Sequence, residues 1–245
     1  MKVDSDLSNQ TTGRYSIRIT SRKTWDTGLF IFDVIHTPYG CGTWPALWLT
    51  NGNLDAWPTT GEIDVMEQVN AATSGNRMAL HTTDGCKMKN QRRQTGSTLW
   101  EDCYNNTNSN SGCVVESEPA GFGAVYNAAG GGVVAMELRK AGIRIWQFGR
   151  LAIPSDVFSG SPNPHGWPTP VADYPNTDCD ISKHFRNQSI IANIDLCGTW
   201  AGESSVYTAD SCPGTCTDFV AQNPSAFKEA YWEFGNFTVY QAPTA

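Results

Sequence analysis

The stretch GEIDVMEQVN, from Gly61 to Asn70, places three carboxylates in a segment of β-strand character. Side chains alternate between the two faces of a strand, so Glu62 and Asp64 project from the same face. Glu67 is five positions after Glu62 and would point the other way in a regular strand. A β-bulge near Val65–Met66 would insert one residue and return Glu67 to the face of its partners. The stretch therefore predicts a bulged strand with three carboxylates on one surface.

Segments on both sides of this strand also have strand patterns. In YSIRIT, residues 15–20, Tyr15, Ile17 and Ile19 share one face, which predicts a half-buried strand. GLFIFDVIH, residues 28–36, is a nearly continuous apolar run and predicts a strand buried on both faces. VVAMELRKAGIRIWQF, residues 133–148, predicts a hairpin that turns near Lys140–Gly142. QSIIANIDLC and FGNFTVYQ predict two further strands.

The segments between these strands are polar and rich in turn-forming residues. NNTNSNSG, residues 105–112, and SGSPNPHGWPTP, residues 159–170, predict loops. GAVYNAAGGGV, residues 123–133, predicts a loop that leads into a strand. One short helix is expected after Asn223, which could cap it, with Pro224 at its first position. No repeat or linker divides the chain, so one β-sandwich is the economical prediction.

The composition favours an extracellular β-protein with a neutral ligand. Charged residues make up 17% of the chain, below the usual quarter, and the formal net charge is −7. The basic residues are scattered, whereas nucleic-acid-binding domains cluster them. An acidic surface repels phosphate backbones and anionic lipid, but it does not repel a polysaccharide. No apolar run reaches the roughly 18 residues of a membrane span.

The eight cysteines have irregular spacings and no paired C-x-x-C motif, which favours disulfides over a zinc site or free thiols. Their pairing stays open. Four N-x-[ST] sequons also fit an oxidising compartment: Asn9, Asn105, Asn187 and Asn236. The opening MKVDSDLSNQ has no apolar h-region and is not a signal peptide. We therefore expect a secreted protein whose signal was removed, or a chain that starts downstream of its natural beginning.

Three neighbouring carboxylates are electrostatically costly, because like charges this close raise at least one pKa. Retaining glycosidases need such a pair: an ionised nucleophile, and a protonated acid about 5–5.5 Å away. An acidic, solvent-facing strand without function would have the same pattern, so the pattern alone leaves both interpretations open. The chain contains no G-x-S-x-G, P-loop or H-E-x-x-H motif, which leaves other enzyme chemistries without support.

The sequence resembles the fungal laminarinase-type branch of glycoside hydrolase family 16, the endo-1,3(4)-β-glucanases. GEIDVMEQVN matches the family signature E-x-D-x-x-E in its bulged form. Further similar segments follow the family's order: GCGTWPALWLT, DAWPTTGE, MALHT, YPNTDCD, CGTWAG, CPGTCTDFV and NPSAFKEAYW. The resemblance covers the chain from about Gly13 to Gln241.

The resemblance implies a role for each carboxylate. Glu62 resembles the nucleophile that attacks the anomeric carbon, and Glu67 resembles the general acid/base. Asp64 resembles the assisting carboxylate that orients Glu62, and its charge should help to hold Glu67 protonated. The product would keep its β configuration.

The resemblance also implies the fold: a concanavalin-like β-jelly-roll sandwich of two antiparallel sheets, with an open substrate cleft on a concave face. We expect one catalytic domain over residues 1–245. Family members usually carry several dozen residues before the segment matching Arg14–Ile19. A strand is therefore expected to be missing, or a sheet edge exposed.

Sugars present apolar C–H faces, so aromatic rings line glucan clefts. By resemblance, Trp48, Trp57 and Trp200 match sugar-stacking positions, whereas Trp44 could serve either the cleft or packing. His81 is expected to hydrogen-bond sugar or carboxylate, the alternative being a satisfied core histidine. Asn193 and Arg14 are weaker polar candidates for the cleft, and Arg14 could instead be an ordinary solvent-facing charge. The remaining aromatic residues with an assignment are expected in the core (Trp25, Trp146, Trp232) or in structural and surface positions (His36, His165, His184).

The implied substrate is a β-1,3-linked glucan, with mixed 1,3-1,4 linkages or 1,6 branches as open options, cut within the polymer. The chemistry needs no metal or organic cofactor, and any calcium ion would be structural. We expect a monomer with no nucleic-acid or membrane partner. Three alternatives stay open: a β-glucan transglycosylase, a non-catalytic β-glucan-binding module on the same fold, and a structural cell-wall protein. The second is disfavoured because all three carboxylates are present.

Overall fold

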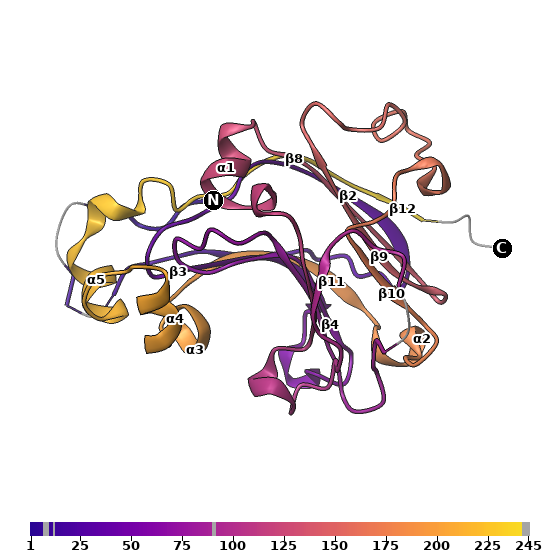
Figure 1. Cartoon of the computed structure of the whole chain (residues 1–245), viewed down its shortest axis with the longest axis horizontal. Helices are drawn as coiled ribbons and strands as arrows, with labels where there is room; N and C mark the ends of the chain where they lie inside the picture. Colours follow the sequence, from indigo (N-terminus) through magenta and orange to yellow (C-terminus); the bar gives the residue numbers. More distant parts are fainter. Residues whose placement is uncertain (7–9, 12, 90–91, 242–245) are drawn as a thin grey trace.

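The carboxylate stretch lies in the middle strand of a seven-stranded antiparallel sheet, which faces a second antiparallel sheet of five strands (Figure 1). The structure is a computed structural model that describes residues 1–6, 10–11, 13–89 and 92–241. The larger sheet contains, in spatial order, β1 (Arg18–Thr20), β11 (Gln188–Leu196), β3 (Thr43–Asn51), β4 (Glu62–Glu67), β5 (Arg77–His81), β7 (Cys113–Glu116) and β6 (Ser97–Trp100). The smaller contains β10 (Ala172–Pro175), β9 (Gly142–Gly149), β8 (Gly132–Arg139), β2 (Gly28–His36) and β12 (Glu233–Tyr240). The predicted all-β sandwich is confirmed.

The main core lies between the two sheets and follows from strand alternation. Leu47 and Leu49 of β3 and Ile63 of β4 are fully buried and belong to one cluster with Phe30 and Phe32 of β2. Each such side chain contributes roughly 1.5–3 kcal/mol through burial. The residues between them point to the opposite face of the larger sheet. That face carries the polar site described below.

Strand β2 is buried on both faces, as its continuous apolar run predicts. Phe30 and Phe32 face the main core, whereas Leu29 and Ile31 belong to a second cluster. That cluster lies on the other side of the smaller sheet, where Trp167 packs against it. A loop thus covers the outer face of β2, and this explains why no polar alternation is seen. The predicted hairpin is also confirmed, because β8 and β9 pair around Lys140 and Ala141.

The helices are short, and three of them gather beside one end of the larger sheet: α3 (Gly198–Ala201), α4 (Ser204–Ala209) and α5 (Cys216–Gln222) (Figure 1). A further α-helix, α2, spans Ile181–His184. The described part of the chain also contains five 3₁₀ turns, at Leu54–Ala56, Asn108–Asn110, Pro119–Gly121, Pro164–Gly166 and Pro224–Phe227. The helix expected after Asn223 is the last of these turns, and the Asn223 side chain makes no capping bond. Of the helices described, none has the length and apolarity needed to cross a membrane.

The segment GAVYNAAGGGV was predicted as a loop, and this prediction is wrong. Its first half forms α1 (Gly123–Ala128), although no side chain caps the helix. The helix is held from outside: Tyr126 is buried, and its hydroxyl donates to the carbonyl of Val34 at 3.2 Å. Tertiary packing can stabilise one turn and a half of helix that local sequence does not favour.

The first strand of the larger sheet differs from its prediction. YSIRIT forms a strand only over Arg18–Thr20, and Tyr15, Ile17 and Ile19 are 86%, 45% and 44% exposed. Among the described residues β1 pairs with β11 alone and is an edge strand, and its apolar side chains stay accessible to solvent. The prediction of a half-buried strand is therefore wrong, whereas an exposed sheet edge is present.

All eight cysteines are paired, which confirms the disulfide prediction. The pairs are Cys41–Cys212, Cys86–Cys179, Cys103–Cys113 and Cys197–Cys216. Among the sequons, Asn187 and Asn236 are exposed and Asn105 is half-exposed, whereas Asn9 lies outside the described residues. Glycosylation of these positions stays a prediction.

Removal of the disulfide with the longest loop should cost the most stability. Cys41 and Cys212 are 171 positions apart, so the double substitution Cys41→Ala/Cys212→Ala releases a large loop in the unfolded chain. We expect the free energy of unfolding to fall by roughly 2–5 kcal/mol, measured from denaturant midpoints under oxidising conditions. The matched control is Cys103→Ala/Cys113→Ala, which opens a loop of only 10 positions and should cost less. Equal midpoints for both variants would contradict the loop-length argument.

Candidate active site

The bulge in β4 brings its three carboxylates to one face of the larger sheet. Asp64 is paired with Trp48 of β3, but the next pair along the ladder is Met66 with Leu47, so Val65 has no partner there. The carboxylates lie opposite every second residue of β3, in the order Thr50, Trp48 and Ala46. Since alternate residues share a face, the predicted bulge is confirmed, and Glu67 joins its partners.

Two tryptophans hold the outer carboxylates. The indole Nε1 of Trp57 donates to Glu62 Oε2 at 2.8 Å. The indole Nε1 of Trp44 donates to Glu67 Oε1 at 2.7 Å. Each bond satisfies one carboxylate oxygen and restricts the rotamer of its glutamate. Trp44 therefore serves the site directly, rather than packing alone.

The central carboxylate belongs to Asp64, which is only 2% exposed. Its Oδ2 lies 3.2 Å from Nε2 of His81, and within the described chain this oxygen has no hydrogen bond of good geometry. His81 lies directly opposite Glu62 in the ladder between β4 and β5. One oxygen from each of Glu62 and Asp64 and one ring nitrogen of His81 lie within 4.8 Å of one another, a spacing that could hold a cation or share a proton.

Burial dominates the electrostatics of this cluster. It raises the pKa of Glu62, Asp64 and Glu67 to about 8 each, and the charge of Asp64 raises the pKa of both glutamates further. The indole bonds and His81 act in the opposite direction on the two glutamates. Three negative charges therefore do not coexist at neutral pH, and the cluster keeps protons. A nucleophile and an acid can occur side by side in such a group.

The glutamates open into a pocket of about 590 Å³. Four indoles line it, those of Trp44, Trp57, Trp100 and Trp200. Polar groups come from His81, from a loop at Ser109–Ser111, from Thr199 in α3 and from Glu203, which caps α4. A few fixed polar groups between aromatic walls suit a ligand with hydroxyls and apolar C–H faces.

A family model described as "XgeA-like, catalytic GH16 domain" matches residues 1–240. The chain belongs to glycoside hydrolase family 16. Among curated proteins, it is 50% identical to a "Probable glycosidase" of Schizosaccharomyces pombe, over 98% of this chain and 57% of that protein. It is 41% identical to an "Endo-1,3(4)-beta-glucanase" of Arthroderma benhamiae, over 95% of this chain and 52% of that protein. The chain thus spans about half the length of these relatives.

Two solved structures of family 16 are close to this domain. Laminarinase 16A from Phanerochaete chrysosporium, solved with β-glucans in its donor and acceptor sites, is 44% identical with a TM-score of 0.93. An elongating family 16 β-1,3-glucosyltransferase is 39% identical with a TM-score of 0.88. Each match covers 98% of this chain and 82% of the other. The jelly-roll sandwich implied by the resemblance is therefore confirmed.

Five of the six predicted sugar-binding residues of this family 16 domain fall into two groups. Trp57, His81 and Trp200 line the pocket. Trp48 and Asn193 lie outside its lining but on the same sheet face, where Trp48 Nε1 donates to Asn193 Oδ1 at 2.7 Å. The guanidinium of Arg18 lies over the Trp48 ring, 4.6 Å from its centroid. Trp48 and Asn193 thus extend the polar face beyond the pocket.

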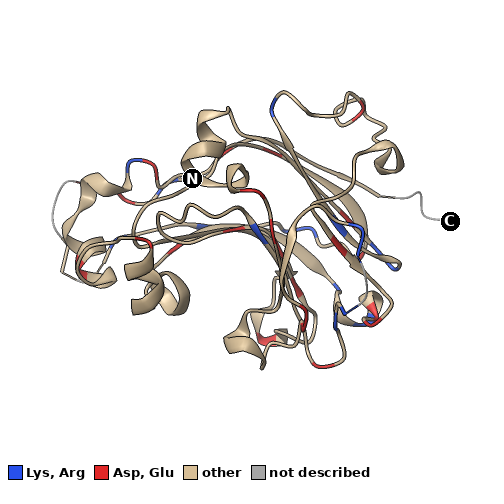
Figure 2. Ribbon diagram, in the orientation of Figure 1, with Lys and Arg blue, Asp and Glu red and all other residues tan. Residues whose placement is uncertain are grey.

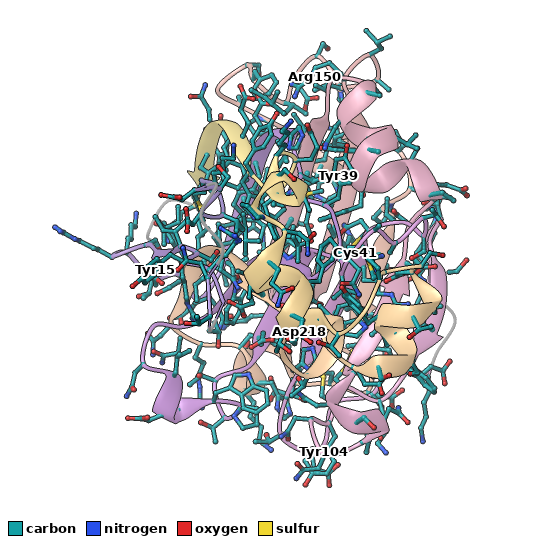
Figure 3. All side chains as sticks on the ribbon, turned by 90° about the vertical axis from the view of Figure 1, so that its left-hand side faces the viewer. Tyr15, Tyr39, Cys41, Tyr104, Arg150 and Asp218 are labelled. Carbon is teal, nitrogen blue, oxygen red and sulfur yellow. A yellow bond between two sulfur atoms is a disulfide. The ribbon has the colours of Figure 1, made fainter. Side chains whose placement is uncertain are left out.

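Arg14 does not join the family 16 pocket. Its guanidinium is buried and donates to the carbonyls of Val220 and Ala221 at 2.8 and 3.1 Å. It also lies 4.0 Å from Asp4. Figure 3 shows its neighbour Tyr15 at the margin of the molecule, far from Tyr104 in the loop at the bottom of the view. Arg14 is thus neither a cleft residue nor a solvent-facing charge: it fastens the N-terminal segment to α5.

The pocket residues that sequence reasoning missed include Arg77, Trp100, Asn110 and Glu203. Arg77 could have been predicted from the sequence, because it precedes His81 by four positions on one strand and so lies on the same face. It lies opposite Glu67 and pairs with Glu116 at 3.1 Å. Trp100 and Asn110 come from segments distant in sequence, and only the fold brings them to the carboxylates.

Substitution of Asp64 by its neutral isostere should stabilise the family 16 domain at alkaline pH. A carboxyl whose pKa is raised in the folded state favours folding below its unfolded pKa of about 4, and this contribution is lost as pH rises through about 8. At pH 8 the Asp64→Asn variant no longer has to bury this charge. We expect its Tm to exceed the parent's by roughly 2–8 °C at pH 8, a relief of about 1–2 kcal/mol, with little difference at pH 4. A constant Tm difference from pH 4 to 8 would contradict this assignment.

Proposed function

We propose that this chain is the catalytic part of an enzyme that hydrolyses β-1,3-glucan within the polymer and retains the β configuration. The observation that carries the proposal is the bulge in β4, which gathers Glu62, Asp64 and Glu67 beneath a tryptophan-walled pocket. Membership of family 16 supports it, as do the similarities to the A. benhamiae endo-1,3(4)-β-glucanase and to Laminarinase 16A.

In the first step, a carboxylate oxygen of Glu62 attacks the anomeric carbon of the glucosyl unit. The bond from that carbon to the glycosidic oxygen breaks, and Glu67 gives its proton to the departing oxygen. The indole N–H of Trp57 orients Glu62 for attack. Because burial raises the pKa of Glu67 to about 8, this acid holds its proton at neutral pH.

In the second step, water replaces the departed sugar. Glu67 is now a carboxylate, and it removes a proton from the water while the water oxygen attacks the anomeric carbon. The ester bond to Glu62 breaks, and Glu62 leaves as a carboxylate. Two inversions at the same carbon restore the β configuration.

Asp64 keeps the charge of the cluster low. Burial raises the pKa of all three carboxyls, and we assign the ionised state to Glu62 because Asp64 is the most deeply buried and lacks, among the described residues, an N–H donor such as the one Trp57 offers Glu62. A neutral Asp64 next to Glu62 removes the like charge that would otherwise oppose ionisation of the nucleophile.

The physical setting supports a neutral, extracellular polymer as substrate. Acidic and basic residues are interspersed along both sheets (Figure 2). The net charge of −7 offers no attraction for an anionic polymer. Four disulfides fit an oxidising compartment, so we include secretion in the proposal. Glucans with mixed 1,3-1,4 linkages or with 1,6 branches are further candidate substrates, and their rates of cleavage can be compared with that of laminarin.

Release of reducing ends from laminarin tests the proposal. We expect steady release of oligosaccharides from inside the polymer, and NMR of fresh product should show the β anomer first. Binding of laminarin without release would support a non-catalytic glucan-binding module instead. Initial formation of the α anomer would rule out the double-displacement mechanism.

Transfer of the glucosyl unit to another sugar is a second candidate activity, because an elongating family 16 β-1,3-glucosyltransferase is 39% identical to this chain. Both activities share the first step and differ in what enters the acceptor side of the pocket. Incubation with laminari-oligosaccharides at rising concentration separates them. Products longer than the starting sugar would indicate transfer, whereas shorter products alone would indicate hydrolysis.

A further inference from the structure

A polar loop packs against the histidine of the carboxylate cluster. The loop runs between Cys103 and Cys113, which form a disulfide, and its Asn110 extends toward β5. Oδ1 of Asn110 lies 3.3 Å from Nδ1 of His81. The other ring nitrogen of His81 lies 3.2 Å from Asp64 Oδ2. The ring therefore bridges the loop and the buried carboxyl.

The backbone of this loop is held in an unfavourable conformation. Asn108, Ser109 and Asn110 have φ angles of 48°, 55° and 64°, in the left-handed region that side chains other than glycine seldom adopt. Three such residues in succession persist only where surrounding structure determines them, and they concentrate at functional sites. Here the disulfide closes the loop, and the backbone N–H of Thr82 donates to the Cys103 carbonyl at 2.8 Å.

The contact with His81 is close along the backbone as well. A Cβ added at Gly112 would lie 2.4 Å from the Leu80 carbonyl oxygen and 3.0 Å from Cε1 of His81. Gly112 also has a φ of 69°. Only glycine lets the chain pass this near to the imidazole. Two parts of the loop thus lie close to the Nδ1 and Cε1 edge of the His81 ring, the Gly112 backbone and the Asn110 amide.

We propose that this loop fixes the proton of His81 on Nδ1, with Asn110 Oδ1 as its acceptor, so that Nε2 faces Asp64 as a proton acceptor. Asn110 is then a positioning residue for the carboxylate cluster. The inference rests on the proposed function, because it names a determinant of the same site. A neutral imidazole has one donor and one acceptor nitrogen, and the partner of one nitrogen sets the role of the other.

This tautomer suits the protonation state of the cluster. Nε2 can accept the hydrogen bond of a protonated Asp64 carboxyl, whose buried Oδ2 otherwise has no hydrogen-bond partner among the residues that the structure describes. The carboxyls that face the ring are Glu62 and Asp64 of β4. With the proton held on Asp64 and donated in a hydrogen bond to His81 Nε2, the charge of the cluster resides on Glu62. The opposite tautomer would direct an N–H at Asp64 and favour its ionised form beside the nucleophile.

Nitrogen-15 NMR of the whole chain tests the tautomer directly, because the sequence contains only four histidines. Long-range proton–nitrogen spectra at pH 7 should show His81 protonated on Nδ1 alone. In the Asn110→Gly variant, which keeps the left-handed backbone without strain, we expect the proton to redistribute toward Nε2. The value of kcat on laminarin should fall roughly ten- to hundredfold, with a smaller change in KM.

The matched control is Asn108→Gly, which makes the same substitution at another left-handed position of the loop, outside the pocket lining. It should keep the parent spectrum and the parent rate. A parent His81 with its proton on Nε2, or on both nitrogens, would overturn the proposal. An unchanged spectrum or an unchanged kcat in Asn110→Gly would do the same. Because the spectra need no activity, a parent that fails to cleave laminarin would refute the proposed function separately.

Discussion

The Glu62→Gln variant is expected to lose roughly 10⁴- to 10⁶-fold in kcat/KM on laminarin, because an amide cannot form the covalent glycosyl intermediate. Glutamine keeps the size of the side chain, and its carbonyl oxygen can still accept the bond from Trp57. The loss should therefore appear in kcat, the rate of the chemical step, and substrate affinity should be nearly unchanged. Reducing-end release and equilibrium binding of laminari-oligosaccharides, measured on the same preparation, check both expectations.

The control for this variant is its thermal unfolding. Burial raises the pKa of Glu62 to about 8, so the folded parent loses stability as pH rises from about 4 toward 8. The neutral amide has no such loss, and at pH 8 the variant should be at least as stable as the parent. A variant that is folded yet retains activity within tenfold of the parent would remove Glu62 from the nucleophile role.

The Glu67→Ala variant should lose roughly 10²- to 10⁴-fold on laminarin, the usual contribution of a general acid/base. An aryl β-glucoside substrate, whose leaving group needs no proton, should lose far less in the first step. Hydrolysis of the glycosyl intermediate then becomes slow, because no base activates the water. Azide, which needs no base, should restore turnover and yield a glycosyl azide of β configuration.

Azide also distinguishes the two glutamates. The Glu62→Gln variant forms no glycosyl intermediate. Azide therefore has no intermediate to attack from the Glu67 side, and no glycosyl azide of β configuration should appear. Equal loss of Glu67→Ala activity on laminarin and on the aryl substrate would argue for structural damage rather than for a lost acid. The Trp44 indole, which donates to Glu67 at 2.7 Å, is the contact to inspect in that case.

Local patterns were enough to predict the centre of this molecule. The five-residue spacing from Glu62 to Glu67 required a bulge, and the ladders on both sides of β4 contain one. Period-two alternation and apolar runs predicted the inner strands, because in a covered sheet the face on which a side chain lies decides whether it is buried. The same alternation wrongly predicted burial for Tyr15 and Ile17, which are exposed. Burial at a sheet edge depends on what lies beside the edge, and the local pattern does not contain that information.

Contacts between residues that are distant in the sequence could not be predicted from local patterns. Arg14 has the chemistry of a cleft residue, yet its partners are the carbonyls of Val220 and Ala221. In the sequence Asn110 is one of several polar residues of a predicted loop. Only the Cys103–Cys113 disulfide and the geometry of the loop place it next to His81. The eight cysteines predicted disulfides but not their pairing, because pairing is decided by the tertiary fold.

Three of the four disulfides fasten the borders of the pocket to the larger sheet. Cys103–Cys113 closes the loop on one side. Cys197–Cys216 and Cys41–Cys212 tie the segment with α3 and α4, and thus Trp200, to the sheet; Figure 3 shows Cys41 near this helical end. Such borders are already ordered before a sugar arrives. Little conformational entropy is then lost on association, and most of the contact energy with a glucan remains available for affinity and for distorting the ring at the scissile bond.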